Sequence, residues 1–136
     1  MAKRLINPQQ LYDGSELGLS QGVVAPSRNL LFVSGQVAWD HQRNVTANTV
    51  GAQFDHALAH LKTVLQEAGA SVGDLLQIRI YVRGELAEHL AVLGPALSAF
   101  LGTSRAAITG VGVASLASPE TLVEVEAVAG VGVSEP

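Results

Sequence analysis

Hydrophobic and polar positions alternate most clearly near the end of the chain. In residues 122–129 the apolar side chains recur at every second position, so Val123 and Val125 face one side while Glu124 and Glu126 face the other. This period predicts a strand with one face in the core. Its opposite face carries two carboxylates about 7 Å apart, which need a cation or a polar site to meet them.

The first part of the chain also has the pattern of a sheet. Residues 3–6 predict a short strand, and the β-rich runs 20–25 and 29–37 predict a hairpin with its turn at 26–29. Gly35 lies inside the last of these runs. A glycine there indicates either a bulge or a close approach by another group.

The middle of the chain changes to a helical period. Residues 52–68 carry one apolar stripe and predict a helix that ends at Gly69. The strand predicted next has two distinct faces, one apolar (Leu76, Ile78, Ile80, Val82) and one polar (Gln77, Arg79, Tyr81, Arg83).

A second helix is predicted over residues 85–101, with leucines on one side. Pro95 should kink or split this helix near Gly94, because proline removes one helical hydrogen bond and clashes with the preceding turn. A glycine-interrupted strand follows over 108–114.

The order of elements predicts one α/β (α+β) domain over residues 1–136, with a mixed sheet and two helices on one face. The uncovered face would carry Arg79, Tyr81, Glu124 and Glu126. That mixture is too polar for the core of a monomer but suits packing against copies of the same chain.

Composition narrows the class of protein. The chain has 136 residues, of which 48% are hydrophobic, and it contains no cysteine, which excludes disulfides and thiol chemistry. A net charge of −4 with eight scattered Lys and Arg residues disfavours a nucleic-acid surface. No signal peptide and no run long enough to cross a membrane are evident, so a cytoplasmic protein without nucleic-acid or membrane partners is expected.

Two groups of side chains could carry chemistry. Glu124 and Glu126 could meet Arg79 and Arg83 on the polar face of another predicted strand. Together they could form either a structural ion-pair network or a site in which one carboxylate accepts and donates protons. His56 and His60 have the four-residue spacing of a metal pair, but they lie away from the apolar stripe and are expected to be solvated. The sequence predicts no metal, no serine nucleophile and no phosphate-binding loop.

Several segments, in order along almost the whole chain, resemble the Rid family, also called YjgF or reactive intermediate deaminase A. They are Ser20-Gln21, residues 31–36 (Leu-Phe-Val-Ser-Gly-Gln), the leucine helix, Ile80-Tyr81-Val82, Val111-Gly112-Val113 and residues 123–127 (Val-Glu-Val-Glu-Ala).

The resemblance implies a chorismate-mutase-like fold in a homotrimer with a central barrel and clefts between subunits. It also implies cofactor-free hydrolysis of reactive enamines and imines to keto acid and ammonia. Glu124 matches the glutamate that positions water in the family. Ser34 and Gly35 match the part of the cleft that approaches the ligand.

Other cleft positions depart from the family pattern. Ile108 stands where the family has a carboxylate-binding arginine, Leu19 where it has a tyrosine, and Gly94 where it has an asparagine. Arg105, three residues before Ile108, could replace the missing arginine or could be a solvated loop residue. Loss of a charge-assisted contact to a carboxylate costs about 2 kcal/mol, so ordinary 2-imino acids should fit poorly.

The leading hypothesis is a cytoplasmic, homotrimeric hydrolase that acts on a small imine, enamine or related carbonyl compound. Glu124 would be its catalytic residue, with Arg105, Ser34, Gly35, Leu19 and Ile108 around the substrate. The alternative is a non-catalytic ligand- or partner-binding trimer, in which Glu124 and Glu126 only pair with Arg79 and Arg83. Arg79 and Glu126 are the residues expected to form structural ion pairs. Ribonuclease activity, also attached to this family, is disfavoured by the acidic chain.

Overall fold

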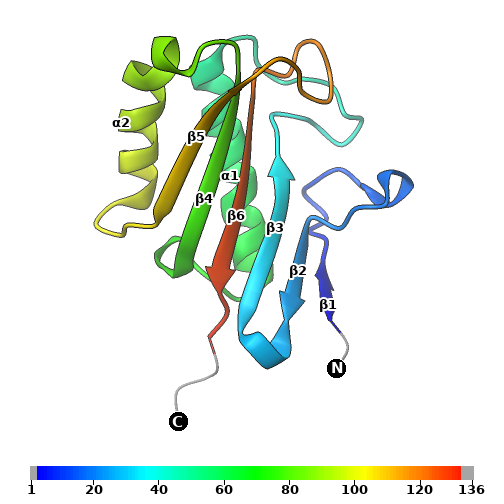
Figure 1. Ribbon diagram of the computed structural model, residues 1–136. Helices are drawn as coiled ribbons and strands as arrows, with labels where there is room; N and C mark the ends of the chain where they lie inside the picture. Colours follow the sequence, from blue (N-terminus) through cyan, green and yellow to red (C-terminus); the bar gives the residue numbers. More distant parts are fainter. Residues whose placement is uncertain (1–2, 133–136) are drawn as a thin grey trace.

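The computed structural model describes residues 3–132, and its main feature is a six-stranded sheet with two helices on one face (Figure 1). The helices are α1 (Val50–Glu67) and α2 (Leu90–Leu101), with 3-10 turns η1 (Ser15–Leu17), η2 (Pro26–Arg28), η3 (Val72–Asp74) and η4 (Leu86–His89). The strands are β1 (Arg4–Ile6), β2 (Gly22–Ala25), β3 (Leu30–Gln36), β4 (Leu75–Arg83), β5 (Ala107–Val113) and β6 (Val123–Gly130). Within residues 3–132 no helix is both long and apolar enough to cross a membrane.

The acidic strand β6 lies in the middle of the sheet. The strand order is β1-β2-β3-β6-β4-β5, and every neighbouring pair is antiparallel except β4 and β5. The parallel pair is joined through α2, as a crossover connection requires. The predicted mixed sheet with helices on one face is therefore confirmed.

Helix α1 supplies most of the helical side of the core. Thr49 caps its first turn by accepting a hydrogen bond from the amide of Ala52 (3.2 Å). The predicted apolar stripe is buried against the sheet, and Phe54, Leu61 and Leu65 have no exposed surface. Each such side chain contributes about 1.5–3 kcal/mol by burial, so α1 is held mainly by its contact with the apolar face of β6 and its neighbours.

The first two residues of β4 differ from the sequence prediction. Leu75 is buried, whereas Leu76, which was expected on the apolar face, is 51% exposed. The register against β6 shifts between Leu75 and Gln77, which marks a bulge. The extra residue turns Leu76 outward, so strict alternation holds only from Gln77 onward.

The second helix also differs in where it is interrupted. The predicted segment 85–101 divides into η4 and α2, and the break lies at His89–Leu90 rather than near Gly94. Pro95 lies inside α2. Only two leucines of α2, Leu93 and Leu101, are buried.

One face of the sheet remains uncovered in a single chain. Figure 1 shows both helices on the same side of the strands. On the other side Phe32 is 48% exposed and Val111 is 38% exposed. We call this uncovered side the open face. The Rid-like trimer expected to cover it stays a prediction.

Candidate functional site

Glu124 projects from the open face near the start of β6, a central strand of the sheet. The burial of β6 alternates along its whole length, with Val123 and Val125 in the core and both Glu124 and Glu126 half-buried on the other side. The strands on both sides fix this orientation, because Glu124 pairs with Tyr81 of β4 and the next β6 residue pairs with Gln36 of β3.

Gly35 lies directly against the carboxylate of Glu124. The register between β3 and β6 shifts between Val33 and Gln36, so a bulge surrounds the glycine. A Cβ atom added to Gly35 would stand 2.5 Å from Cδ and 2.7 Å from Oε2 of Glu124, closer than non-bonded carbon atoms pack. Both alternatives left open for this glycine are therefore present, a bulge and a close approach.

Two buried glutamines, Gln21 and Gln36, hold the backbone around Gly35, and nothing in the period of the strands indicates this role. Nε2 of Gln36 donates to Oε1 of Gln21 (2.9 Å) and to the carbonyl of Ser34 (3.0 Å), and Nε2 of Gln21 donates to the carbonyl of Tyr12 (3.0 Å). The hydroxyl of Ser34 donates to the carbonyl of Ser20 (2.5 Å). Through its hydroxyl, Ser34 therefore ties β3 to the backbone of the segment before β2.

Arg79 and Tyr81 both bind Glu126, the second glutamate of the pair. Nη1 of Arg79 lies 3.8 Å from Oε1 of Glu126, and the hydroxyl of Tyr81 donates to the same oxygen. This hydrogen bond is the main reason why the pKa of Tyr81 is raised. Arg79 and Tyr81 are therefore bound to Glu126 rather than to Glu124.

The electrostatics of Glu124 follow from this arrangement. Burial raises the pKa of its carboxyl, and the negative charge of Glu126 raises it further. The charge of Glu124 also contributes to the raised pKa of Tyr12, a buried phenol whose shift comes first from desolvation. Tyr12 is thus within electrostatic reach of the site, although nothing in its sequence context indicated this.

Arg83, the other cation expected near the glutamates, has a different role. Its guanidinium donates to the carbonyls of Ser118 (2.8 Å), Thr121 (3.2 Å) and Ala114 (3.3 Å). It therefore anchors the segment between β5 and β6. The proposed pairing of Arg83 with a glutamate was wrong because the backbone carbonyls of this connection surround the side chain.

Of three further predicted substrate-binding residues, Arg105 and Ile108 lie away from Glu124 within one chain, whereas Leu19 directly precedes Ser20, whose carbonyl accepts from Ser34. Nη1 of Arg105 donates to the carbonyls of Ser104 (2.6 Å) and Gly102 (2.8 Å) after α2. On β5, Ile108 lies three residues, about 10 Å, before Val111, which is level with Glu124 across the sheet. Leu19 packs against Gly14 in the loop before β2.

The histidine pair connects α1 to the loop after β3. Nδ1 of His60 lies 2.9 Å from the carbonyl of Val37, so this nitrogen carries the proton, and Nδ1 of His56 lies 2.7 Å from the hydroxyl of Thr46. His60 is half-buried rather than solvated, and burial lowers its pKa. Within residues 3–132 no group of three or more His, Asp or Glu side chains could hold a metal ion.

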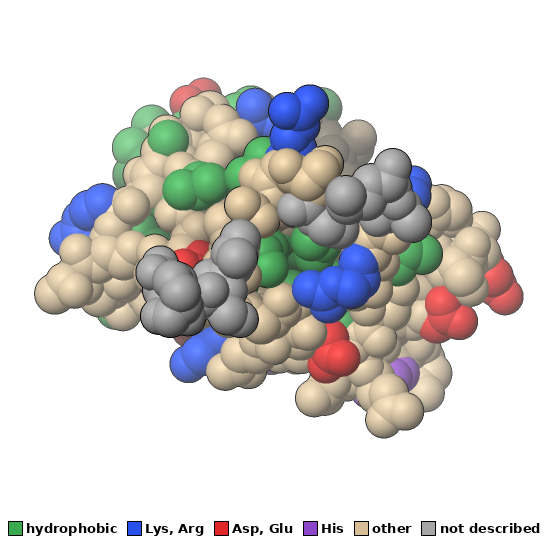
Figure 2. Space-filling view, turned by 90° about the horizontal axis from the view of Figure 1, so that it is seen from below, with side chains coloured by type: hydrophobic (Ala, Val, Ile, Leu, Met, Phe, Trp, Pro, Cys, Tyr) green, Lys and Arg blue, Asp and Glu red, His purple; other side chains and the backbone are tan. Residues whose placement is uncertain are grey.

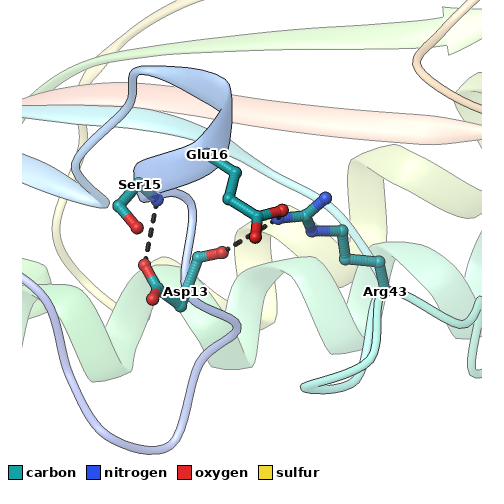
Figure 3. A network of polar contacts seen from close by, with 4 residues as sticks. All are labelled: Asp13, Ser15, Glu16 and Arg43. Carbon is teal, nitrogen blue, oxygen red and sulfur yellow. Dashed lines mark hydrogen bonds and ion pairs between the residues drawn. The ribbon is translucent and has the colours of Figure 1, made fainter.

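A polar network joins the two loops at the β2 side of the sheet (Figure 3). The side chain of Arg43 lies 3.6 Å from Glu16 and donates to the carbonyl of Asp13 (3.2 Å), while the carboxylate of Asp13 accepts from the amide of Ser15 (2.9 Å). All of these groups are at the surface, so the network orders the loops and adds little to stability.

Comparisons with known proteins identify the family of this chain. The family model described as Endoribonuclease L-PSP matches residues 14–131. A RutC family protein of Pyrococcus abyssi is 28% identical over 102 residues, which cover 74% of this chain and 78% of the relative.

Solved structures share the fold over nearly the whole chain. A Mycobacterium tuberculosis member of the YjgF/YER057c/UK114 family is 26% identical with a TM-score of 0.80, covering 96% of this chain and 100% of its own. A Yersinia pestis protein of the conserved Rid family, described as of unknown function, is 37% identical with a TM-score of 0.73 at the same coverage. Together with the match of the family model to most of its length, these similarities show that this chain belongs to the Rid/YjgF family.

Proposed function

We propose that this protein is a hydrolase of small imines or enamines that works without a cofactor. Glu124 is its acid–base residue, and a second subunit completes the cleft. The observation that carries the proposal is the contact between Glu124 and Gly35. The absence of a side chain at Gly35 leaves the space in which this half-buried carboxylate lies against the backbone of β3.

The chemistry needs one group that both accepts and donates a proton. Glu124 would take a proton from water as the oxygen attacks the C=N carbon and would pass it to the nitrogen, which gives a carbinolamine. It would then move the remaining hydroxyl proton to the nitrogen as the C–N bond breaks. The products are a carbonyl compound and ammonia. A raised pKa suits this exchange, because a carboxylate with a higher pKa is a stronger base toward water, and a pKa nearer the working pH lets one group act as both base and acid.

Ribonuclease activity, named in the description of the family model, has less support in this chain. The net charge is −4, and Figure 2 shows Lys and Arg side chains spread around the visible face rather than gathered into one surface. Phosphate backbones bind to clustered cations.

The test measures ammonia release from freshly generated 2-aminoacrylate, from 2-iminopropionate and from an imine without a carboxylate. Wild type is compared with Glu124→Gln and with Ile108→Arg, and sedimentation confirms that each variant keeps its assembly. We expect wild type to accelerate the third reaction and Glu124→Gln to lose about 10²-fold or more of that rate.

The other outcomes are equally informative. Acceleration of 2-iminopropionate hydrolysis by wild type that disappears in Arg105→Ala would place Arg105 at the substrate carboxylate. No acceleration by wild type or Ile108→Arg, in stable assemblies, would contradict the hydrolase and favour the non-catalytic binding protein.

A further inference from the structure

The chain leaves β3 through a tight turn at residues 37–39, which we call the exit turn. The amide of Trp39 donates to the carbonyl of Val37 (2.9 Å), and the side chain of Val37 is buried. Val37 directly follows Gln36, the glutamine that holds the bulge around Gly35. The exit turn therefore continues the strand that forms one side of the site.

The exit turn is also tied to the segment that leads into the other strand of the site. Nε1 of Trp39 donates to Oγ1 of Thr121 (2.9 Å), which lies just before β6. Glu124 is the second residue of β6. A shift of the exit turn would therefore reach both Gly35 and Glu124, the two residues whose contact defines the site.

His60 anchors the exit turn from the helical side of the sheet. Its Nδ1 donates to the carbonyl of Val37 (2.9 Å), and the same carbonyl accepts from the amide of Trp39, so both of its lone pairs are used. Burial lowers the pKa of His60, so the ring is neutral at neutral pH and acts as a donor rather than as a charge. The next residue, Leu61, has no exposed surface. The exit turn is thus fastened to a part of α1 that the core holds in place.

A second contact, one turn earlier on α1, supports the same backbone. The amide (2.9 Å) and the hydroxyl (3.1 Å) of Thr46 both donate to the carbonyl of Ala38, and Nδ1 of His56 lies 2.7 Å from that hydroxyl. Because the hydroxyl proton is used toward Ala38, the nitrogen of His56 carries the proton of its bond to Thr46. His56 therefore acts on the turn through Thr46, whereas His60 contacts it directly.

Resting on the proposed function, we infer that His60 is a positioning residue, whose hydrogen bond to Val37 fixes the exit turn and so keeps Gly35 and Glu124 in the arrangement that hydrolysis needs. His60 acts through the backbone, from the helical side of the sheet. Loss of its donor should therefore change the surroundings of Glu124 without removing any residue of the site. Displacement of a reacting group by about 1 Å can cost about 10²-fold in rate.

The first measurement needs no turnover. The carboxyl of Glu124 is titrated by carbon-13 NMR in the intact protein, and its signal is assigned by its loss in Glu124→Gln. In His60→Leu the pKa of Glu124 should fall toward its ordinary value of 4.5, because a relaxed bulge opens the carboxylate to water. His60→Asn should restore the raised pKa, since a side-chain amide can donate from close to the position of Nδ1.

The second measurement compares the same variants in hydrolysis of the imine without a carboxylate. His60→Leu should lower kcat about tenfold or more with a smaller change in KM, and His60→Asn should keep most of the rate. His89→Leu is the matched control, because His89 lies in η4 and its side chain makes no capping hydrogen bond to α2. It should leave kcat and the pKa of Glu124 unchanged.

The inference is overturned if His60→Leu leaves both the pKa of Glu124 and kcat unchanged, even if urea titration shows lower stability. Failure of His60→Asn to restore them would also overturn it, since the loss would then follow from the ring and not from its hydrogen bond. Absence of turnover by wild type would refute the hydrolase, whereas the titration of Glu124 would still decide whether His60 positions it.

Discussion

At the scale of single residues, Gly35 and Glu124 depend on one another. The glycine leaves the space in which the carboxylate lies, and the bulge around it brings the backbone of β3 close to that carboxylate. The two buried glutamines then keep this backbone in place. The position of the Glu124 carboxylate therefore depends on the absence of a side chain at Gly35.

Gly35→Ala should displace the Glu124 side chain. Because the added Cβ would lie 2.5 Å from Glu124 Cδ, we expect a loss of about 1–3 kcal/mol in the free energy of unfolding and loss of imine hydrolysis. Gly94→Ala is the matched control, since nothing lies within 4 Å of its added Cβ. Urea titration compares the two variants, and equal stability would show that the contact is relaxed at no cost.

Glu124→Gln should change how stability depends on pH. The pKa of Glu124 lies above its ordinary value of 4.5 in the folded protein, so its stabilising contribution is complete below that value and is lost as the pH rises through the folded pKa. Denaturant titrations from about pH 4 to about pH 7 should therefore show wild type losing stability relative to the glutamine variant. Glu67→Gln controls for the loss of one carboxylate, and parallel curves would contradict the raised pKa.

At the scale of elements, the connection between β5 and β6 depends on Arg83. Its guanidinium is bound to three carbonyls of this segment, and its own amide donates to the carbonyl of Leu122 (2.8 Å). The end of β4 thus positions the residues that lead into the acidic strand.

Arg83→Met should release this connection. Loss of the three contacts is expected to lower the free energy of unfolding by about 1–3 kcal/mol and to accelerate amide hydrogen exchange in residues 114–121. Arg28→Met, in the exposed turn η2, removes a cation elsewhere. Unchanged exchange in 114–121 would show that the contacts do not restrain the segment.

Regular parts of these elements were predictable from the sequence, and the irregular parts were not. In α1 and β6 the apolar residues at the helical and strand periods are the ones that are buried, because both elements are regular along their whole length. Leu76 was misplaced because a bulge shifts the period by one residue without a sequence signal. Gly35 was singled out, but its neighbour Glu124 comes from a distant strand, and only the register of β3 against β6 reveals that contact.

At the scale of the whole molecule, the two sides of the sheet are unequal. One side is covered by helices. The other leaves Phe32 and Val111 exposed on the same face as the partly exposed ion pair of Arg79 and Glu126. The Rid fold is consistent with assembly into an oligomer, and the open face is where we expect the subunits to meet.

Sedimentation equilibrium should therefore give a mass of about three times the 14.1 kDa of one chain. Phe32→Asp should lower this mass, because it places a charge in the expected interface. Leu90→Asp is the control, since Leu90 is similarly exposed (54%) but lies on α2 on the helical side. Dissociation by Leu90→Asp instead would assign the interface to the helices.

The central position of β6 has a consequence for biosynthesis. It is the last of the six strands to leave the ribosome, yet it joins β3 to β4, with pairs as distant in sequence as Leu30 and Gly130. Until β6 emerges, the nascent chain holds two separate half-sheets with unpaired edges, and such contacts form slowly. A premature stop codon before Val123 would leave both edges open, which makes the truncated product a target for aggregation and proteolysis.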